Sequence, residues 1–221
     1  MSRVYLLVEG QTEEAFVNEL LEPHYSRHGL YLIPILVRTS PGYRGGVVSY
    51  GKVRQQVEKL CKQDAGAYVS TLFDLYGLPN DFPGKGSPDF PQTGSGHSKA
   101  EFLEAQWALD VAQNNFIPNL LVHEFEALLF VRLDVFKQWT DDDEVLSPLR
   151  TARQQEAPED INEGIQTAPS KRILAAWSGY QKTVHGPLIA CDIGLNAIRE
   201  ECPHFDAWLE KLDALAHRTL K

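Results

Sequence analysis

The sequence predicts an α/β fold: a mainly parallel sheet flanked by helices, followed by a helical C-terminal part. Two observations favour this class. Strand-like apolar runs alternate with amphipathic helical patterns in the first half of the chain, and helical patterns dominate after residue 131. Helices of this length between strands form right-handed crossovers, which make neighbouring strands parallel. The carboxyl ends of such strands meet at one edge of the sheet, where open α/β sheets bind ligands.

Each element follows from its own pattern. Four strands are predicted by short apolar runs, at 3–9, 31–37, 67–73 and 117–122. Helical spacing of apolar residues predicts helices at 11–28, 52–62 and 98–113, and Ser98 is the expected cap of the third. Later helices are expected from Pro169, at 188–200 and at 205–220. We therefore expect an α/β core over residues 1–131 and a helical C-terminal subdomain over 132–221 that packs on it.

A long loop is expected at 75–97, where the sequence holds four prolines and five glycines. Loops of this length in compact domains are usually functional or disordered. Its position directly after the third strand favours a lid or a substrate-facing loop. A merely flexible insertion is the alternative, with about equal weight.

Composition indicates an ordinary cytoplasmic globular protein. With 221 residues, 43% of them hydrophobic, the chain can bury a good core. The three cysteines, Cys61, Cys191 and Cys202, are widely spaced and are expected to be buried free thiols. No apolar run is long enough for a signal peptide or a membrane span, so no membrane partner is expected.

The formal net charge of −9 is unevenly distributed. Residues 100–164 hold 14 acidic and 4 basic side chains, so the excess of negative charge lies in this segment. Elsewhere the charges nearly balance, which leaves room for a basic face that binds nucleic acid.

Three predicted strands end on acidic residues. Glu9 follows the first strand, with Glu13 four residues later in the following helix, and Asp74 follows the third strand. Such carboxylates are ligands that Mg²⁺ or Mn²⁺ prefers. Glu13 alone has a simpler explanation, because an acid at a helix N-terminus also complements the helix dipole. Their repetition at three strand ends favours a metal site.

The fourth strand runs into the segment HEFE, residues 123–126. Glu124 and Glu126 share a face if this segment is extended and diverge if it is helical, so one of them is the expected ligand. His123 is close enough to act as a proton carrier or as a hydrogen-bond partner of a carboxylate. A structural histidine is the alternative.

Basic residues near two loops are candidate contacts for a phosphate backbone. The segment GVVSYGK at 46–52 has the GxxxxGK spacing of a phosphate-binding loop, but it lacks the following Ser or Thr and a preceding strand. Nucleotide binding is therefore not expected there. The candidate phosphate contacts are Arg38, Arg44, Lys52 and Arg54 around this loop, and Lys171 and Arg172 in the first turn of a later helix. Solvated surface charge is the alternative for all six.

Several segments resemble a bacterial family, domain of unknown function family 4276, and the resemblance covers nearly the whole chain. HEFEALLF at 123–130 is the most specific of them. The others are VEGQTEEAF at 8–16, FDLYG at 73–77, APSKRI at 168–173, HGPLIA at 185–190, IGL at 193–195 and CPHFDAWL at 202–209. The family is itself similar to the Toprim fold of topoisomerases, primases and overcoming-lysogenization-defect nucleases.

The resemblance implies a magnesium-dependent nuclease. In that fold a glutamate after the first strand and a later DxD motif hold the metal, and the nuclease branch adds a glutamate four residues on and another downstream. Glu9, Glu13 and Asp74 match these positions, and Glu124 or Glu126 is the downstream acid. The resemblance further implies DNA as the expected nucleic acid, a bacterial defence or DNA-processing role, and an ATPase partner. A homo-oligomer stays possible.

Tyr76 departs from the pattern, because it stands where the second aspartate of DxD is expected. A phenol is a poor ligand for Mg²⁺ near neutral pH, since it must first lose a proton with a pKa near 10. Three explanations stay open: a glutamate of HEFE compensates, Tyr76 positions a water or phosphate, or the site binds without cutting. A non-catalytic module that docks a partner protein is therefore the alternative to a nuclease.

Overall fold

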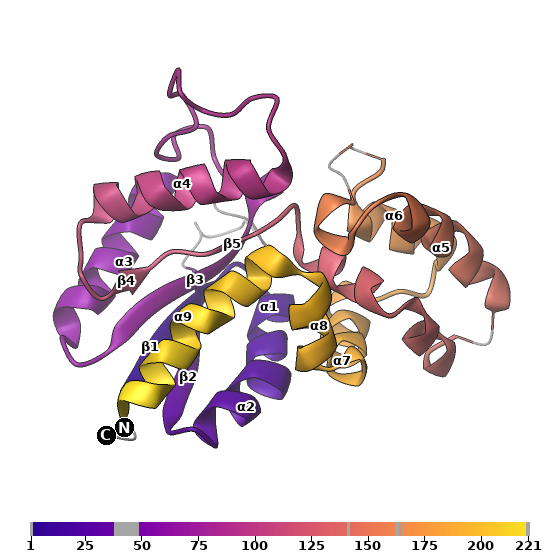
Figure 1. The fold of residues 1–221 in the computed structure, drawn as a ribbon, viewed down its shortest axis with the longest axis horizontal. Coiled ribbons are helices and arrows are strands. Elements are labelled where there is room, and N and C mark those ends of the chain that lie inside the picture. Colours follow the sequence, from indigo (N-terminus) through magenta and orange to yellow (C-terminus); the bar gives the residue numbers. More distant parts are fainter. Residues whose placement is uncertain (1, 38–48, 141, 162–163, 165, 220–221) are drawn as a thin grey trace.

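The chain forms a parallel sheet with helices on both faces (Figure 1). The computed structural model describes residues 2–37, 49–140, 142–161, 164 and 166–219. The strands are β1 (Ser2–Val8), β2 (Leu30–Leu36), β3 (Tyr68–Asp74), β4 (Phe116–Ile117) and β5 (Leu120–Leu121). They run in the order β2-β1-β3-β4, β5 also pairs with β3, and every pairing is parallel. The predicted fold class is confirmed.

Alternate residues of the central strand β1 serve two separate hydrophobic cores. Leu7 points to the face covered by α3 (Tyr50–Gln63) and α4 (Gly96–Val111). Leu6 and Val8 point to the other face, which is covered by α1 (Gln11–Phe16) and α9 (Pro203–Thr219). Because β1 is apolar on both faces, it reads as a continuous hydrophobic run, as buried parallel strands do.

Proline and glycine interrupt three elements that the sequence predicts as continuous. The first helix is α1, a π-helical turn at Val17–Leu21, and α2 (Glu22–Ser26); Pro23 at the start of α2 has no N–H to continue the α-helical ladder. The fourth strand is split into β4 and β5 at Pro118 for the same reason. The helix expected at 188–200 is two helices, α7 (Lys182–Ile193) and α8 (Leu195–Glu201), separated by Gly194 with φ of 84°.

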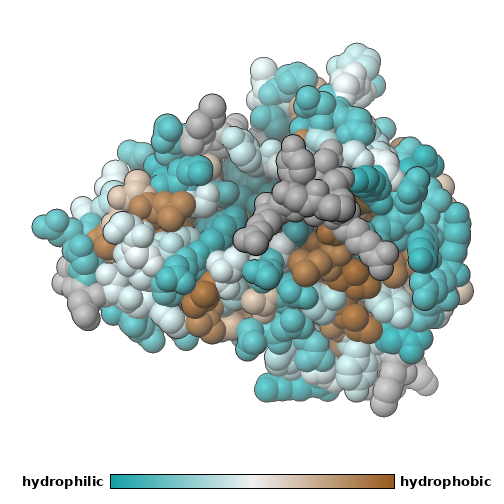
Figure 2. Space-filling view, turned by 180° about the vertical axis from the view of Figure 1, so that it is seen from behind, coloured by the Kyte–Doolittle hydropathy of each residue, from teal (hydrophilic) through white to brown (hydrophobic). Residues whose placement is uncertain are grey.

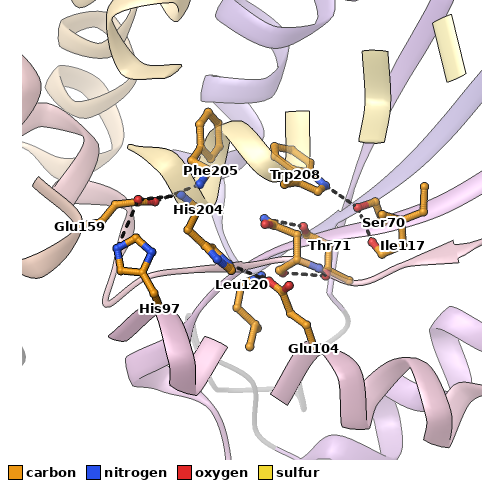
Figure 3. Close-up of polar contacts among 11 residues, drawn as sticks. Ser70, Thr71, His97, Glu104, Ile117, Leu120, Glu159, His204, Phe205 and Trp208 are labelled. Atoms are coloured by element: carbon orange, nitrogen blue, oxygen red, sulfur yellow. Dashed lines mark hydrogen bonds and ion pairs between the residues drawn. The ribbon is translucent and has the colours of Figure 1, made fainter. Parts of the chain in front are cut away.

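The gap in the fourth strand is bridged by side chains of β3 (Figure 3). Thr71 Oγ1 donates to the carbonyl of Asn119 at 2.8 Å and accepts from its N–H at 2.9 Å. On the other face, Ser70 Oγ donates to the carbonyl of Ile117 and accepts from the Trp208 indole of α9 at 3.0 Å. These buried hydroxyls supply the partners that the broken strand lacks.

The C-terminal helices share a core with the sheet. After α5 (Leu146–Gln155) and α6 (Pro169–Ala176), helices α7, α8 and α9 return to the face that holds Leu6 and Val8. Trp208 and Leu212 of α9 are fully buried there. The division into a core over 1–131 and a subdomain over 132–221 stays a prediction, with the two ranges joined by one hydrophobic cluster.

The segment between β3 and α4 is anchored to the core. It begins with a 3-10 turn at Leu75–Gly77 and then rises above α4 (Figure 1). Leu78 and Phe82 are buried, and the Phe82 ring lies 4.9 Å from that of Trp107 in a T-shaped contact. This anchoring argues against a merely flexible insertion. Its function as a lid stays a prediction.

The surface of the described residues is largely polar. On the face shown in Figure 2, apolar areas are separated by hydrophilic surface. None of the helices that the structure describes is long and apolar enough to cross a membrane. Cys61 and Cys202 are buried free thiols as predicted, whereas Cys191 is partly exposed.

Candidate functional site

The ends of β1 and β3 place Glu9 and Asp74 side by side. Val8 and Leu72 are paired in the two strands, so the residues that follow them emerge at the same edge. Glu9 Oε1 accepts a hydrogen bond from the Asp74 N–H at 3.0 Å, and Asp74 Oδ1 accepts one from the Phe125 N–H at 3.0 Å. The first strand end, the third strand end and the HEFE segment are therefore tied together.

Glu13 joins this edge from the first turn of α1, where its side chain is buried. Two glycines leave room for the carboxylates. A Cβ on Gly10 would lie 3.3 Å from Glu13 Oε2, and one on Gly77 would lie 3.6 Å from Glu9 Oε2. The VEG and LYG glycines thus let backbone approach the acids closely.

Glu124 and Glu126 differ in backbone conformation and in hydrogen-bond partners, and which of them is a ligand stays a prediction. Glu124 is extended, and a 3-10 helix begins at the next residue. Glu124 is bound by α6, because it accepts hydrogen bonds from the Ser170 N–H and, at 3.0 Å, from the Ser170 hydroxyl. Glu126 is fully buried, and its charge contributes to the raised pKa of Asp74.

Lys182, the first residue of α7, extends into the acids. Its Nζ lies 2.9 Å from Glu126 Oε2, and the Tyr180 hydroxyl lies 3.5 Å from Glu126 Oε1. α7 reaches this position by packing against α1. At Gly186 a Cβ would lie 3.0 Å from the Tyr180 hydroxyl, 3.1 Å from Phe125 and 3.6 Å from Thr12 of α1. Sequence reasoning missed Lys182. A lysine in a first turn, which opposes the helix dipole, is the signal that points to it.

Burial and mutual repulsion hold the acids partly protonated. Burial and the charge of Glu13 raise the pKa of Glu9 to about 8, and burial raises the pKa of Glu126 to about 7. Burial also raises the pKa of Glu13, and burial and the neighbouring carboxylates raise that of Asp74 well above its usual value. Although burial opposes it, the carboxylates of Glu126 and Asp74 raise the pKa of Lys182.

The donor set fits a hard divalent cation, but its side chains are not arranged around one. Among the described residues, no three His, Cys, Asp or Glu side chains converge as metal ligands. Five carboxylates, those of Glu9, Glu13, Asp74, Glu124 and Glu126, interact with the charge of Lys182. They therefore carry an excess of negative charge that a cation can neutralise in place of protons. Oxygen-only ligands are the type that Mg²⁺ and Mn²⁺ take. Binding requires the carboxylates to rotate toward a common centre.

His123 is buried beside the acids in a left-handed backbone conformation, with φ of 66°. Its carbonyl accepts from the Tyr76 N–H at 3.1 Å, and its Nε2 lies 3.0 Å from where a Cβ on Gly96 would be. A non-glycine residue with positive φ is a strained feature that often occurs at functional sites. A role for His123 as a proton carrier stays a prediction.

The candidate phosphate contacts are scattered. Arg38 and Arg44 lie outside the described residues. Arg54 forms ion pairs with Glu58 at 3.0 Å and Asp110 at 3.1 Å, and Lys52 is exposed on the same helix, α3. Lys171 and Arg172 directly follow Ser170, the residue that binds Glu124. Lys171 and Arg172 are therefore adjacent in sequence to a residue that binds one of the acids.

A second polar cluster, shown in Figure 3, joins α4, the 3-10 turn Pro158–Asp160 and α9. The buried Glu159 carboxylate accepts from the N–H groups of His204 and Phe205 at 2.9 and 3.0 Å, which caps α9. His204 Nε2 lies 3.0 Å from Glu104, whose carboxylate also accepts from the Leu120 N–H. Because these groups satisfy one another, the cluster has a structural role.

Comparison with known proteins identifies one family and two similar structures. The family model described as Domain of unknown function (DUF4276) matches residues 8–213. The C-terminal region of the Burkholderia pseudomallei OLD protein is 15% identical, with a TM-score of 0.46, over 96% of this chain and 98% of that chain. The C-terminal region of the Xanthomonas campestris pv. campestris OLD protein is 15% identical, with a TM-score of 0.39, over the same shares. The search of curated proteins found no significant match.

Proposed function

The chain belongs to the family described as Domain of unknown function (DUF4276), and we propose that it is a Toprim-like nuclease that hydrolyses phosphodiester bonds with Mg²⁺ or Mn²⁺. One observation carries the proposal. Glu9, Glu13, Asp74 and Glu126 gather around Lys182 at the carboxyl edge of a parallel sheet, where such folds bind ligands.

Each side chain has a separate role in this proposal. Glu9 and Asp74 would hold one divalent ion, and Glu13 and Glu126 would hold a second. The chemistry that bound ions supply is activation of a water nucleophile and neutralisation of charge on the phosphate. Lys182, now paired with Glu126, would supply an ammonium that stabilises the negative charge developing on the phosphate oxygens.

Glu126 replaces the second aspartate of the DxD motif in this scheme. It enters the cluster from the HEFE segment, whereas Tyr76 is 55% exposed and lies beyond the strand end. A carboxylate from another element supplies the same oxygen ligand without the proton that a phenol must lose. Glu124 is not assigned to the metal, because Ser170 already binds both of its oxygens.

The test is cleavage of supercoiled and linear DNA and of RNA in Mg²⁺ or Mn²⁺, with and without a neighbouring ATPase. Wild type is expected to cut, and Glu9→Gln and Asp74→Asn are expected to abolish cutting. Glu14→Gln, in the same helical turn as Glu13, is the matched control and is expected to cut as wild type does. Cleavage that survives Glu9→Gln and Asp74→Asn contradicts the metal mechanism.

The partner and the setting belong to the same proposal. DNA as substrate, an ATPase partner and a role in bacterial defence or DNA processing are what the family resemblance implies. The ATPase arm of the cleavage assay tests whether the nuclease is silent until its partner engages nucleic acid.

A catalytically inactive docking module is the second candidate. It is favoured by the ion pair of Lys182 with Glu126, which supplies a counter-charge for one acid without any metal. It is further favoured by the absence, among the described residues, of side chains already converged on a metal position. Failure of wild type to bind any divalent ion makes this candidate the better account.

A further inference from the structure

A pocket lies next to the acidic site, between the loop that follows β3 and helix α4. Its volume is about 190 Å³. The residues that define its chemistry are Tyr76, Lys85, Phe90, Gln92, Lys99 and His123. Drug-sized ligands occupy pockets of roughly 300–1,000 Å³, so this one fits a single ring-sized group.

The pocket abuts the acids through the backbone. Tyr76 lies two residues after Asp74, and its N–H donates to the carbonyl of His123, the residue before Glu124. Gly77, which follows Tyr76, lies against the Glu9 carboxylate. A group bound in the pocket would therefore lie beside a phosphate at the acidic site, as a base lies beside its own phosphate.

The lining suits a nucleobase. Tyr76 offers a half-exposed aromatic ring, and Phe90 offers a second that is held by a T-shaped contact with Phe102 at 5.9 Å. The Gln92 amide can pair with the polar edge of a base. Two ammonium groups stand at the same pocket. Lys85 donates to the Leu78 carbonyl at 2.6 Å, and Lys99 has no ion pair among the residues that the structure describes, so it can meet a phosphate.

We propose that this pocket binds one unpaired nucleobase next to the phosphate held at the acidic site, which makes single-stranded or frayed nucleic acid the substrate class. The inference rests on the proposed function. Base stacking on aromatic side chains tolerates any sequence, because every base has a π-face. Tyr76, which does not serve as a metal ligand in this account, positions the strand by stacking.

The test measures binding of fluorescein-labelled strands to the chain by fluorescence anisotropy. Ca²⁺ replaces Mg²⁺ in the buffer. The probes are oligo-dT, an abasic strand of equal length, and the oligo-dT·dA duplex. Wild type is expected to bind oligo-dT more tightly than the other two. Tyr76→Ala is expected to weaken oligo-dT binding roughly 5- to 150-fold, the range of one stacked base, and to leave the abasic strand unchanged. Tyr76→Phe keeps the ring and is expected to bind as wild type does.

Leu109→Ala is the matched control, because Leu109 is 73% exposed on α4 and does not line the pocket. Equal affinity of wild type for oligo-dT and the abasic strand overturns the proposal without any variant. An equal loss of affinity for oligo-dT and for the abasic strand in Tyr76→Ala also overturns it.

Calorimetry with Mn²⁺ separates this inference from the proposed function. If the protein prefers oligo-dT over the abasic strand but binds no Mn²⁺, the pocket is supported and the nuclease proposal is contradicted. Mn²⁺ binding and cleavage without base preference overturn the pocket alone. Oligo-rU in place of oligo-dT shows whether the pocket accepts RNA as well as DNA. Tighter binding of either strand than of its abasic counterpart supports the pocket.

Discussion

Lys182 sets the charge balance of the acidic site. Its ammonium pairs with Glu126 and lowers the pKa of Glu9 and Glu13 against the effect of burial. In the proposed mechanism Lys182 would exchange Glu126 for a phosphate oxygen when substrate binds. Its position at the first residue of α7, partly exposed, allows that movement.

Lys182→Met is expected to separate metal binding from catalysis. It removes positive charge from the acids, so affinity for Mn²⁺ is expected to stay equal or increase. It also removes a group that stabilises charge on the phosphate, and kcat is expected to fall about 100- to 1,000-fold. Calorimetry and single-turnover cleavage measure the two quantities. Weaker Mn²⁺ binding in this variant contradicts the role given to Lys182.

At the same scale, the sequence predicts some site residues and not others. Glu9 and Asp74 follow strands that are recognisable from apolar runs, so their meeting follows from the parallel sheet. Choosing Glu126 over Glu124 requires the conformation of the HEFE segment, which its residue types leave open. Lys182 comes from a helix far along the chain, so its place depends on how α7 packs on α1.

At the scale of elements, helix α4 approaches the HEFE segment closely at Gly96, beside the pocket residue His123. A Cβ on Gly96 would lie 2.6 Å from Val122 and 3.0 Å from the His123 ring. Both neighbours are buried, so neither can move without disturbing the core.

Gly96→Ala is therefore expected to lower the free energy of unfolding by about 1–3 kcal/mol, the usual cost of overpacking. Gly51→Ala is the matched control, since a Cβ at Gly51 in α3 meets nothing within 4 Å. There alanine is expected to be neutral or to stabilise by up to about 1 kcal/mol through helix propensity. Urea unfolding measures both. Equal effects of the two substitutions contradict the packing argument.

The same scale shows where local sequence fails to predict element boundaries. Strand and helix order is readable because hydrophobic periodicity survives in each element. The breaks at Pro23, Pro118 and Gly194 were missed because the apolar pattern continues across them. The side chains that compensate, such as Thr71 bonding to Asn119, lie on a different element and become visible only when the sheet is assembled.

At the scale of the whole molecule, the acidic site makes stability depend on pH. Glu9 holds its proton to about pH 8 in the folded protein but loses it above about 4.5 when unfolded. The folded state therefore binds more protons between these values, and the contribution of Glu9 to stability is lost as pH rises toward 8. A divalent cation is expected to replace that proton and restore stability at high pH.

Glu9→Gln tests this linkage, because an amide keeps the acceptor for the Asp74 N–H but cannot ionise. In EDTA, the variant and wild type are expected to have similar Tm near pH 5, and the variant is expected to be the more stable near pH 8.5. Added Mn²⁺ is expected to raise the Tm of wild type only. A constant difference in Tm across this range contradicts the raised pKa of Glu9.

Titration of Mn²⁺ into the protein by isothermal calorimetry tests the central claim most directly. The account predicts that wild type binds Mn²⁺ and that Asp74→Asn weakens binding by at least about tenfold. Glu124→Gln is expected to keep binding, because Ser170 already binds both oxygens of that acid. No binding by wild type, or unchanged binding by Asp74→Asn, contradicts the claim that these acids form a metal site.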